Sequence, residues 1–145
     1  MQNKSTRFLI DTNLFIAAVK HGETKSTELL LKLLEGPWDL IADDILLAEY
    51  ERYANQFDAE DLLALLKKRM IVIEQSEQEI RKCRQYISSD EAADIIHAAA
   101  CLHAGAILIS NDTHFKEIDK AGVIEVWTIA EAIEKFLEIG SNTLF

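Results

Sequence analysis

The stretch SSDEAADIIHAAACLHAGAILISND, residues 88–112, decides the fold of this chain. From Ala92 to Ala106 it is apolar on almost every side, which is typical of a buried helix. Asp94 lies inside this apolar stretch, and an unpaired carboxylate on a buried helix is costly. A bound cation is the simplest compensation. The segment then continues as an apolar strand and ends in a further acid, Asp112.

Short apolar strands alternate with capped or amphipathic helices along the rest of the chain, which predicts an α/β fold. Helices on both faces should cover a mostly parallel, five-stranded sheet. Strands are expected at residues 7–10, 38–41, 70–73, 106–109 and 123–126. Helices are expected at 14–19, 24–35, 43–54, 58–69, 76–87, 114–120 and 128–139, with the central helix ending before Gly105. Capping boxes are expected at 76–79, 88–91 and 128–131. The box at 88–91 would start the central helix.

The size of the chain predicts one domain. Its 145 residues form a single unit, 1–145, with a loose tail from about residue 140. Cys83 and Cys101 fall in predicted helices without metal-ligand spacing, so we expect reduced thiols in a cytoplasmic protein. No apolar run approaches a membrane span, and the N-terminal one is too short for a signal peptide.

The net charge of −10 argues against binding nucleic acid by bulk charge, and it favours basic partners. It leaves room for a nucleic-acid enzyme whose acidic pocket holds a metal. RNA phosphates would then need local cations. The candidates are Lys67 to Arg69, Arg81 to Arg84, Lys20 and Lys25, although charged helix faces usually only contact solvent.

Two acids come directly after predicted strands. Asp11 follows the strand at 7–10, and Asp112 follows the strand at 106–109. The carboxyl ends of parallel strands lie at one edge of the sheet, where ligands bind in open α/β folds. We therefore expect Asp11 and Asp112 to meet near Asp94.

Each of these acids also has a structural explanation. The explanations are an N-cap for Asp11, a turn after a strand for Asp112, a helix start for Asp90, and a helix edge paired with Arg52 or Tyr53 for Glu49. Asp94 is the hardest to explain in this way, because its helix has no polar face. Asp90 lies about one turn before Asp94 and is a candidate supporting residue.

The residue types favour a hard cation. His97 lies one turn from Asp94, but a buried histidine with a satisfied hydrogen bond is commoner than a ligand. No pair of histidines has the HExxH spacing of zinc sites. Carboxylates without sulfur suit Mg²⁺ or Mn²⁺. Without a cation the acids repel one another, and at least one should have a raised pKa.

Four segments together resemble a PIN domain. They are FLIDTN at 8–13, the helical Glu49, ADIIHAAA at 93–100 and AILISNDTHF at 106–115. Each is weak alone, but their order and spacing fit across nearly the whole chain. The resemblance implies a three-layer α/β/α fold and a metal-dependent ribonuclease. Small PIN proteins resemble the toxins of VapC-type toxin–antitoxin pairs, which implies an antitoxin partner and a homodimer.

The resemblance also implies a set of site residues. Asp11, Glu49, Asp94 and Asp112 match the acidic quartet that would bind the metal, and Asn13 and Ser110 match the supporting polar residues. Glu49 is chosen over its acidic neighbours Asp43, Asp44 and Glu51 by its position on the helix. The resemblance implies Asp11 and Asp94 as inner metal ligands.

Rival functions remain open at this point. One is a non-catalytic PIN-like module that binds RNA or protein, although the complete quartet argues against it. Others are a receiver domain or a haloacid-dehalogenase-type phosphatase, which also use aspartates at strand ends. The phosphatase needs a second acid where this chain has Asn13, and the receiver needs a lysine after a late strand, which Val126-Trp127-Thr128 lacks.

Overall fold

The computed structural model describes residues 6–138, so the expected tail lies outside the described residues. The strands are β1 (Arg7–Ile10), β2 (Asp39–Ala42), β3 (Met70–Val72), β4 (Ile107–Ile109) and β5 (Glu125–Trp127). The α-helices are α1 (Thr12–Lys20), α2 (Lys25–Glu35), α3 (Asp44–Gln56), α4 (Glu60–Arg69), α5 (Glu77–Arg84), α6 (Ala92–Ala104), α7 (Lys116–Lys120) and α8 (Ile129–Ile133). A 3₁₀ turn, η1 (Thr113–Phe115), precedes α7, and a π-helix, η2 (Glu134–Glu138), continues α8.

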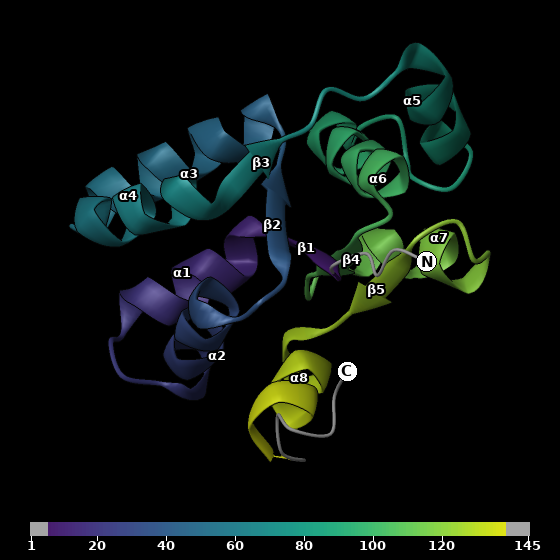
Figure 1. Ribbon diagram of the computed structural model, residues 1–145. Coiled ribbons are helices and arrows are strands. Elements are labelled where there is room, and N and C mark those ends of the chain that lie inside the picture. Colours follow the sequence, from purple (N-terminus) through teal and green to yellow (C-terminus); the bar gives the residue numbers. More distant parts are fainter. Residues whose placement is uncertain (1–5, 139–145) are drawn as a thin grey trace.

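The sheet has five strands, all parallel, in the order β3-β2-β1-β4-β5 (Figure 1). The expectation of a mostly parallel sheet is therefore confirmed. After the charged first residues of β1 and β2, Arg7 and Asp39, the central strands are apolar because both faces of the sheet are covered, and Phe8, Leu9 and Leu40 have no exposed surface.

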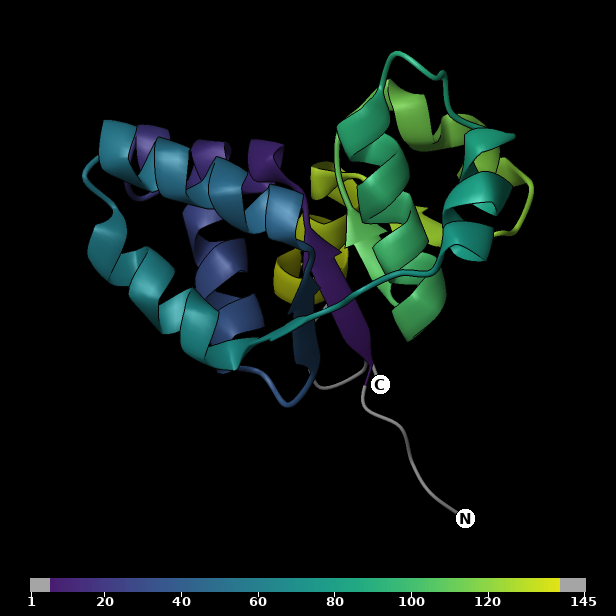
Figure 2. The same cartoon turned by 90° about the horizontal axis from the view of Figure 1, so that it is seen from above.

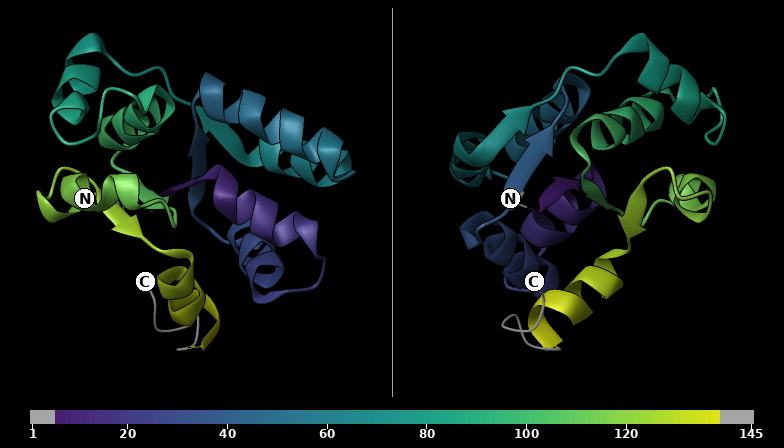
Figure 3. Two further views of the ribbon diagram at one scale, coloured as in Figure 1. Left: turned by 180° about the vertical axis from the view of Figure 1, so that it is seen from behind. Right: turned by 45° about the vertical axis from the view of Figure 1, so that its right-hand side comes forward.

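Helices cover the sheet on both faces and give three layers. On one face, α6 packs across β1, β2 and β4, and α5 packs against α6. On the other side lie α1 to α4, with α8 against α2 (Figures 2 and 3). An aromatic cluster of Phe8, Trp38, Trp127 and Phe136 ties β1, β2 and β5 to η2, with Trp38 and Phe136 ring centroids 4.9 Å apart.

Two of the three expected capping boxes are confirmed, at Ser76 and at Thr128. The third, at 88–91, is wrong. The central helix begins at Ala92, with Glu91 as an N-cap that makes no side-chain capping bond. The Ser88 carbonyl instead accepts a hydrogen bond from the Glu91 amide, which closes a turn before the helix.

Among residues 6–138, no helix is long and apolar enough to cross a membrane. The topology fixes where polar groups can gather. The chain moves from β1 towards β2 and β3, then crosses back to β4 and β5, so the direction of the strand order changes between β1 and β4. Ligands bind at such a point, beyond the carboxyl ends of the strands. The residues after β1 and β4 therefore mark the place to search for a site.

Candidate active site

A pocket of about 240 Å³ opens beyond the carboxyl ends of β1 and β4. The acids Asp11, Glu49, Asp94 and Asp112 all line it, although they come from four different segments of the chain. The other lining residues are Thr12, Asn13, Ile16, Tyr53 and His97. The expected convergence of the acids at one sheet edge is what the structure shows.

Asp11 is buried at the end of β1 and is also the N-cap of α1. Its Oδ1 accepts a hydrogen bond from the Thr12 amide at 2.7 Å, and its Oδ2 accepts one from the Ser110 hydroxyl at 2.5 Å. Burial raises its pKa although these hydrogen bonds oppose the shift. The N-cap explanation is correct, and it does not remove Asp11 from the pocket.

Ser110 and Asn13 connect the first and last acids. The Ser110 hydroxyl oxygen also accepts a hydrogen bond from the Asp112 amide at 3.0 Å. The Asn13 amide donates to Asp11 Oδ2 and to Ser110 Oγ, both at 3.3 Å, and its Oδ1 accepts from the Asn111 amide at 3.4 Å. The two predicted supporting residues thus tie the start of α1 to the loop after β4.

Asp94 lies in the first turn of α6, with only 13% of its side chain exposed. Burial raises its pKa to about 6, and the nearby charges of Asp112 and Asp11 add to the shift, while a hydrogen bond from His114 opposes it. The expectation that a metal-free quartet would contain an acid with a raised pKa is confirmed at both Asp94 and Asp11, although burial, and not repulsion between the acids, is the largest cause at each.

Asp112 occupies a turn, as its structural explanation predicts, since its Oδ1 accepts a hydrogen bond from the His114 amide at 2.9 Å. The side chain of His114 lies close to Asp94 and Asp112. Its Nδ1 lies 2.7 Å from Asp94 Oδ2 and 2.9 Å from Asp112 Oδ1, and its Nε2 lies 3.5 Å from Glu91 Oε1. Glu91, Asp94 and His114 could together hold a metal ion. No sequence spacing indicated this group.

Glu49 projects from α3, and its pKa is lowered, whereas the pKa values of Asp11 and Asp94 are raised. Its Oε1 accepts a hydrogen bond from Thr12 Oγ1 at 2.8 Å and lies 3.4 Å from His97 Nε2. The hydrogen bond from His97 lowers the pKa of Glu49. Of the neighbouring acids, Asp43 is buried as the N-cap of α3, and Asp44 is exposed.

His97 is buried, as expected, with a satisfied hydrogen bond. Its Nδ1 lies 2.6 Å from Asp43 Oδ2, and only 1% of either side chain is exposed. Burial would lower the pKa of His97, but its hydrogen bonds to Asp43 and Glu49 outweigh that effect and raise the pKa to about 10.

Asp90 is exposed, in the turn before α6, and it does not belong to the residues that line the pocket. Because α6 begins only at Ala92, Asp90 is not on this helix, and its supporting role stays a prediction. The other candidate residues do reach the pocket or contact an acid that lines it.

The PIN domain family model matches residues 8–121 of this chain. This chain belongs to the PIN domain family. A comparison with curated proteins found no match.

Solved structures show the same fold as this PIN domain. A toxin–antitoxin complex from Klebsiella pneumoniae is 22% identical, with a TM-score of 0.60, and the match covers 83% of this chain and 96% of that one. FitAcB from Neisseria gonorrhoeae is 19% identical, with a TM-score of 0.60 and coverages of 85% and 98%. VapBC2 from Rickettsia felis, bound to a promoter DNA fragment, is 18% identical, with a TM-score of 0.57 and coverages of 85% and 98%.

The donor set of this PIN domain fits a divalent cation. The pocket offers carboxylate oxygens, which hard cations prefer. Burial raises the pKa of Asp11 and of Asp94, so ionising both has a cost that a cation would offset. The charge of His97 lowers the pKa of Asp11 and of Asp94, but burial outweighs this effect at both acids.

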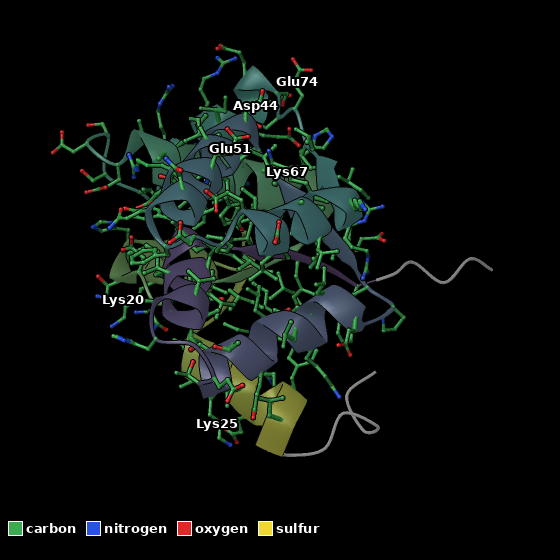
Figure 4. The ribbon with its side chains drawn as sticks, turned by 90° about the vertical axis from the view of Figure 1, so that its left-hand side faces the viewer. Lys20, Lys25, Asp44, Glu51, Lys67 and Glu74 are labelled. Atoms are coloured by element: carbon green, nitrogen blue, oxygen red, sulfur yellow. The ribbon has the colours of Figure 1, made fainter. Side chains whose placement is uncertain are left out.

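The cations suggested for phosphate binding mostly lie elsewhere in the PIN domain. Lys67 pairs with Glu51 at 2.5 Å on the outer side of α3 and α4 (Figure 4). Arg69 binds backbone carbonyls, including that of Trp38 at 2.8 Å. Lys20 ends α1, about 12 Å along the helix from its start at the pocket. Lys25 begins the next helix.

One cation does lie beside the pocket. The guanidinium carbon of Arg52 lies 4.8 Å from the centre of the Tyr53 ring, and Tyr53 lines the pocket. Arg52 is exposed and its charge acts on Glu49. Sequence reasoning had considered these two residues only as structural partners of Glu49.

Proposed function

We propose that this PIN domain is a metal-dependent endoribonuclease that hydrolyses RNA phosphodiester bonds. Asp11, Glu49, Asp94 and Asp112 are the proposed site acids. The observation that carries the proposal is their convergence, from four segments, on one pocket at the point where the strand order changes direction. The family match supports a nuclease, and the oxygen-rich donor set supports Mg²⁺ or Mn²⁺.

Different residues have different proposed roles in metal binding. A bound Mg²⁺ or Mn²⁺ supplies Lewis acidity, which lowers the pKa of a water molecule and offsets the charge of the phosphate. Asp11 and Asp94, the two acids with raised pKa values, are the proposed inner ligands. Glu49 and Asp112 complete the site. Asn13 and Ser110 hold Asp11 in place through their hydrogen bonds.

Arg52 and Tyr53 are the proposed contacts for the RNA next to the cleaved bond. Aromatic rings stack on unpaired bases, and a guanidinium contacts phosphate. Arg52 lies over the Tyr53 ring and donates a hydrogen bond to its hydroxyl, and Tyr53 lines the pocket, whereas Lys67 pairs with Glu51 and Arg69 with backbone carbonyls. A local cation of this kind is needed because the chain carries a net charge of −10.

The proposed biological role is the toxin of a toxin–antitoxin pair in the cytoplasm, acting as a homodimer that an antitoxin protein binds. Support comes from the neighbouring folds, one of which was solved as a toxin–antitoxin complex. Co-expression of the neighbouring open reading frame would test this role, since an antitoxin should restore growth to cells that the nuclease arrests.

Cleavage of a fluorescent single-stranded RNA tests the activity. The wild type should cleave only with added Mg²⁺ or Mn²⁺, and Asp94→Asn should lose at least about 100-fold in rate. Asp61→Asn, which changes an exposed acid in the first turn of α4, is the matched control. Full activity in excess chelator would overturn the proposal. Metal-independent RNA binding without cleavage would favour a non-catalytic module.

A further inference from the structure

His97 joins two carboxylates from inside the protein. Its Nδ1 lies 2.6 Å from Asp43 Oδ2, and its Nε2 lies 3.4 Å from Glu49 Oε1. Asp43 is itself fixed, because its other oxygen accepts a hydrogen bond from the Leu46 amide at 2.8 Å, at the start of α3. The imidazole therefore cannot turn without breaking a buried contact.

The two partners determine what the ring can do. A carboxylate oxygen only accepts hydrogen bonds, so a ring nitrogen that bonds to it must carry a hydrogen. Nδ1 lies 2.6 Å from Asp43 Oδ2, and Nε2 lies 3.4 Å from Glu49 Oε1, so each ring nitrogen faces a carboxylate oxygen. Neither nitrogen is therefore free to bind a metal or a substrate without breaking one of these contacts.

Glu49 is held through a single oxygen. Oε1 accepts a hydrogen bond from the Thr12 hydroxyl at 2.8 Å, and His97 Nε2 lies 3.4 Å from the same oxygen. Within residues 6–138, Oε2 makes no hydrogen bond, and Glu49 lines the pocket. The contacts to Thr12 and His97, both on one oxygen, restrict the carboxylate and leave the other oxygen available.

We infer that His97 is a positioning residue, anchored by Asp43, that holds Glu49 so that Oε2 is presented to a divalent cation. The inference rests on the proposed function, since it takes Glu49 to be part of a metal site. Outer partners of this kind orient the residues that bind metal, and their loss typically weakens metal binding about 10–100-fold.

Two substitutions separate the two contacts of His97. The amide nitrogen of asparagine reaches about as far as Nδ1, and that of glutamine about as far as Nε2. His97→Asn therefore keeps a donor to Asp43 but withdraws from Glu49, whereas His97→Gln keeps a donor to Glu49. Mn²⁺ affinity of the folded proteins, measured by calorimetry without RNA, is the readout.

We expect the Mn²⁺ affinity of His97→Asn to fall about 10-fold or more. The Mn²⁺ affinity of His97→Gln should fall less than about threefold. His103→Asn, an exposed change on the same helix, should match the wild type. In a Glu49→Gln background, His97→Asn should have little further effect. An unchanged affinity in His97→Asn, or an equal loss in that background, would overturn the inference.

The metal-binding role of Glu49 can be tested separately from the role of His97. If Glu49→Gln leaves Mn²⁺ affinity unchanged, then Glu49 is not a metal ligand. In that case both its proposed role in the site and the positioning role of His97 are wrong. If Glu49→Gln weakens binding and His97→Asn does not, only the role of His97 is wrong. Should His97→Asn not fold, ¹⁵N NMR of the wild-type ring at neutral pH decides. A hydrogen on Nε2, the nitrogen that faces Glu49, supports the inference, and an Nε2 without a hydrogen overturns it.

Discussion

The Ser110 hydroxyl lies 2.5 Å from Asp11 Oδ2, across 99 positions of sequence. This hydrogen bond joins the carboxyl ends of β1 and β4 at the point where the strand order changes direction. Ser110 also accepts the Asp112 amide, so one hydroxyl fixes two acids of the candidate site.

Ser110 should be replaceable by threonine but not by alanine. Ser110→Ala removes a charge-assisted hydrogen bond to a buried carboxylate, so Mn²⁺ affinity should fall about 10-fold or more. Ser110→Thr keeps the hydroxyl and should stay within about threefold. Calorimetric titration of both variants checks this. Equal affinities in the two variants would show that the hydroxyl does not organise the site.

Asp94→Asn should stabilise the metal-free protein while it abolishes cleavage. The pKa of Asp94 is raised to about 6, so its protonated form stabilises the fold below about pH 4, and that contribution is lost as the pH rises through 6. Asparagine does not ionise, so the variant does not lose this stability as the pH rises. The variant should gain up to about 3 kcal/mol over the wild type at pH 7.5, and little at pH 4.

Urea unfolding in chelator, at both pH values, measures this difference. The Asp61→Asn variant, in which an exposed acid is changed, provides the reference. A gain for Asp94→Asn that is the same at pH 4 and pH 7.5 would contradict the assigned pKa, whatever the effect on cleavage.

Asp90 and Asp112 should behave differently when each is changed to asparagine. Asp90 is exposed and outside the pocket, so Asp90→Asn should keep its cleavage rate within about twofold, whereas Asp112→Asn should lose at least about 10-fold. Asparagine can replace either residue in a turn. Initial rates at saturating Mn²⁺ make the comparison. A large loss in Asp90→Asn would restore it as a supporting residue.

Substitution of Arg52 or Tyr53 should weaken RNA binding more than it weakens metal binding. Loss of a stacked base should cost about 1–3 kcal/mol in Tyr53→Ala. Arg52→Gln should weaken binding and reduce its salt dependence. Fluorescence anisotropy with an Asp94→Asn background prevents cleavage during the measurement. Lys67→Gln is the control, because that lysine pairs with Glu51 on the outer side of the helices.

Much of this site follows from local sequence rules. Asp11 and Asp112 could be placed at one sheet edge because each comes directly after an apolar strand. Asp94 was recognised by the cost of a charge on an apolar helix. The structural explanations of Asp11 and Asp112 are also correct, because a carboxylate can cap a helix or turn with one oxygen and still face a pocket.

The contacts that local rules missed join distant positions. Asp43 and His97 are 54 residues apart, and Asp94 and His114 are 20 apart, with no periodicity to relate either pair. The wrong capping box has another cause. The pattern at 88–91 satisfies a turn as well as a helix start, because Glu91 can donate to the Ser88 carbonyl.

The central position of β1 has a consequence during synthesis. β1 is made first, but one of its two neighbours, β4, follows about a hundred residues later. A ribosome that has translated only as far as α5 therefore carries a sheet with one side of β1 unpaired, open to mispairing, and without two of the four acids. A product that stops there lacks Asp94 and Asp112, so it cannot form the four-acid pocket.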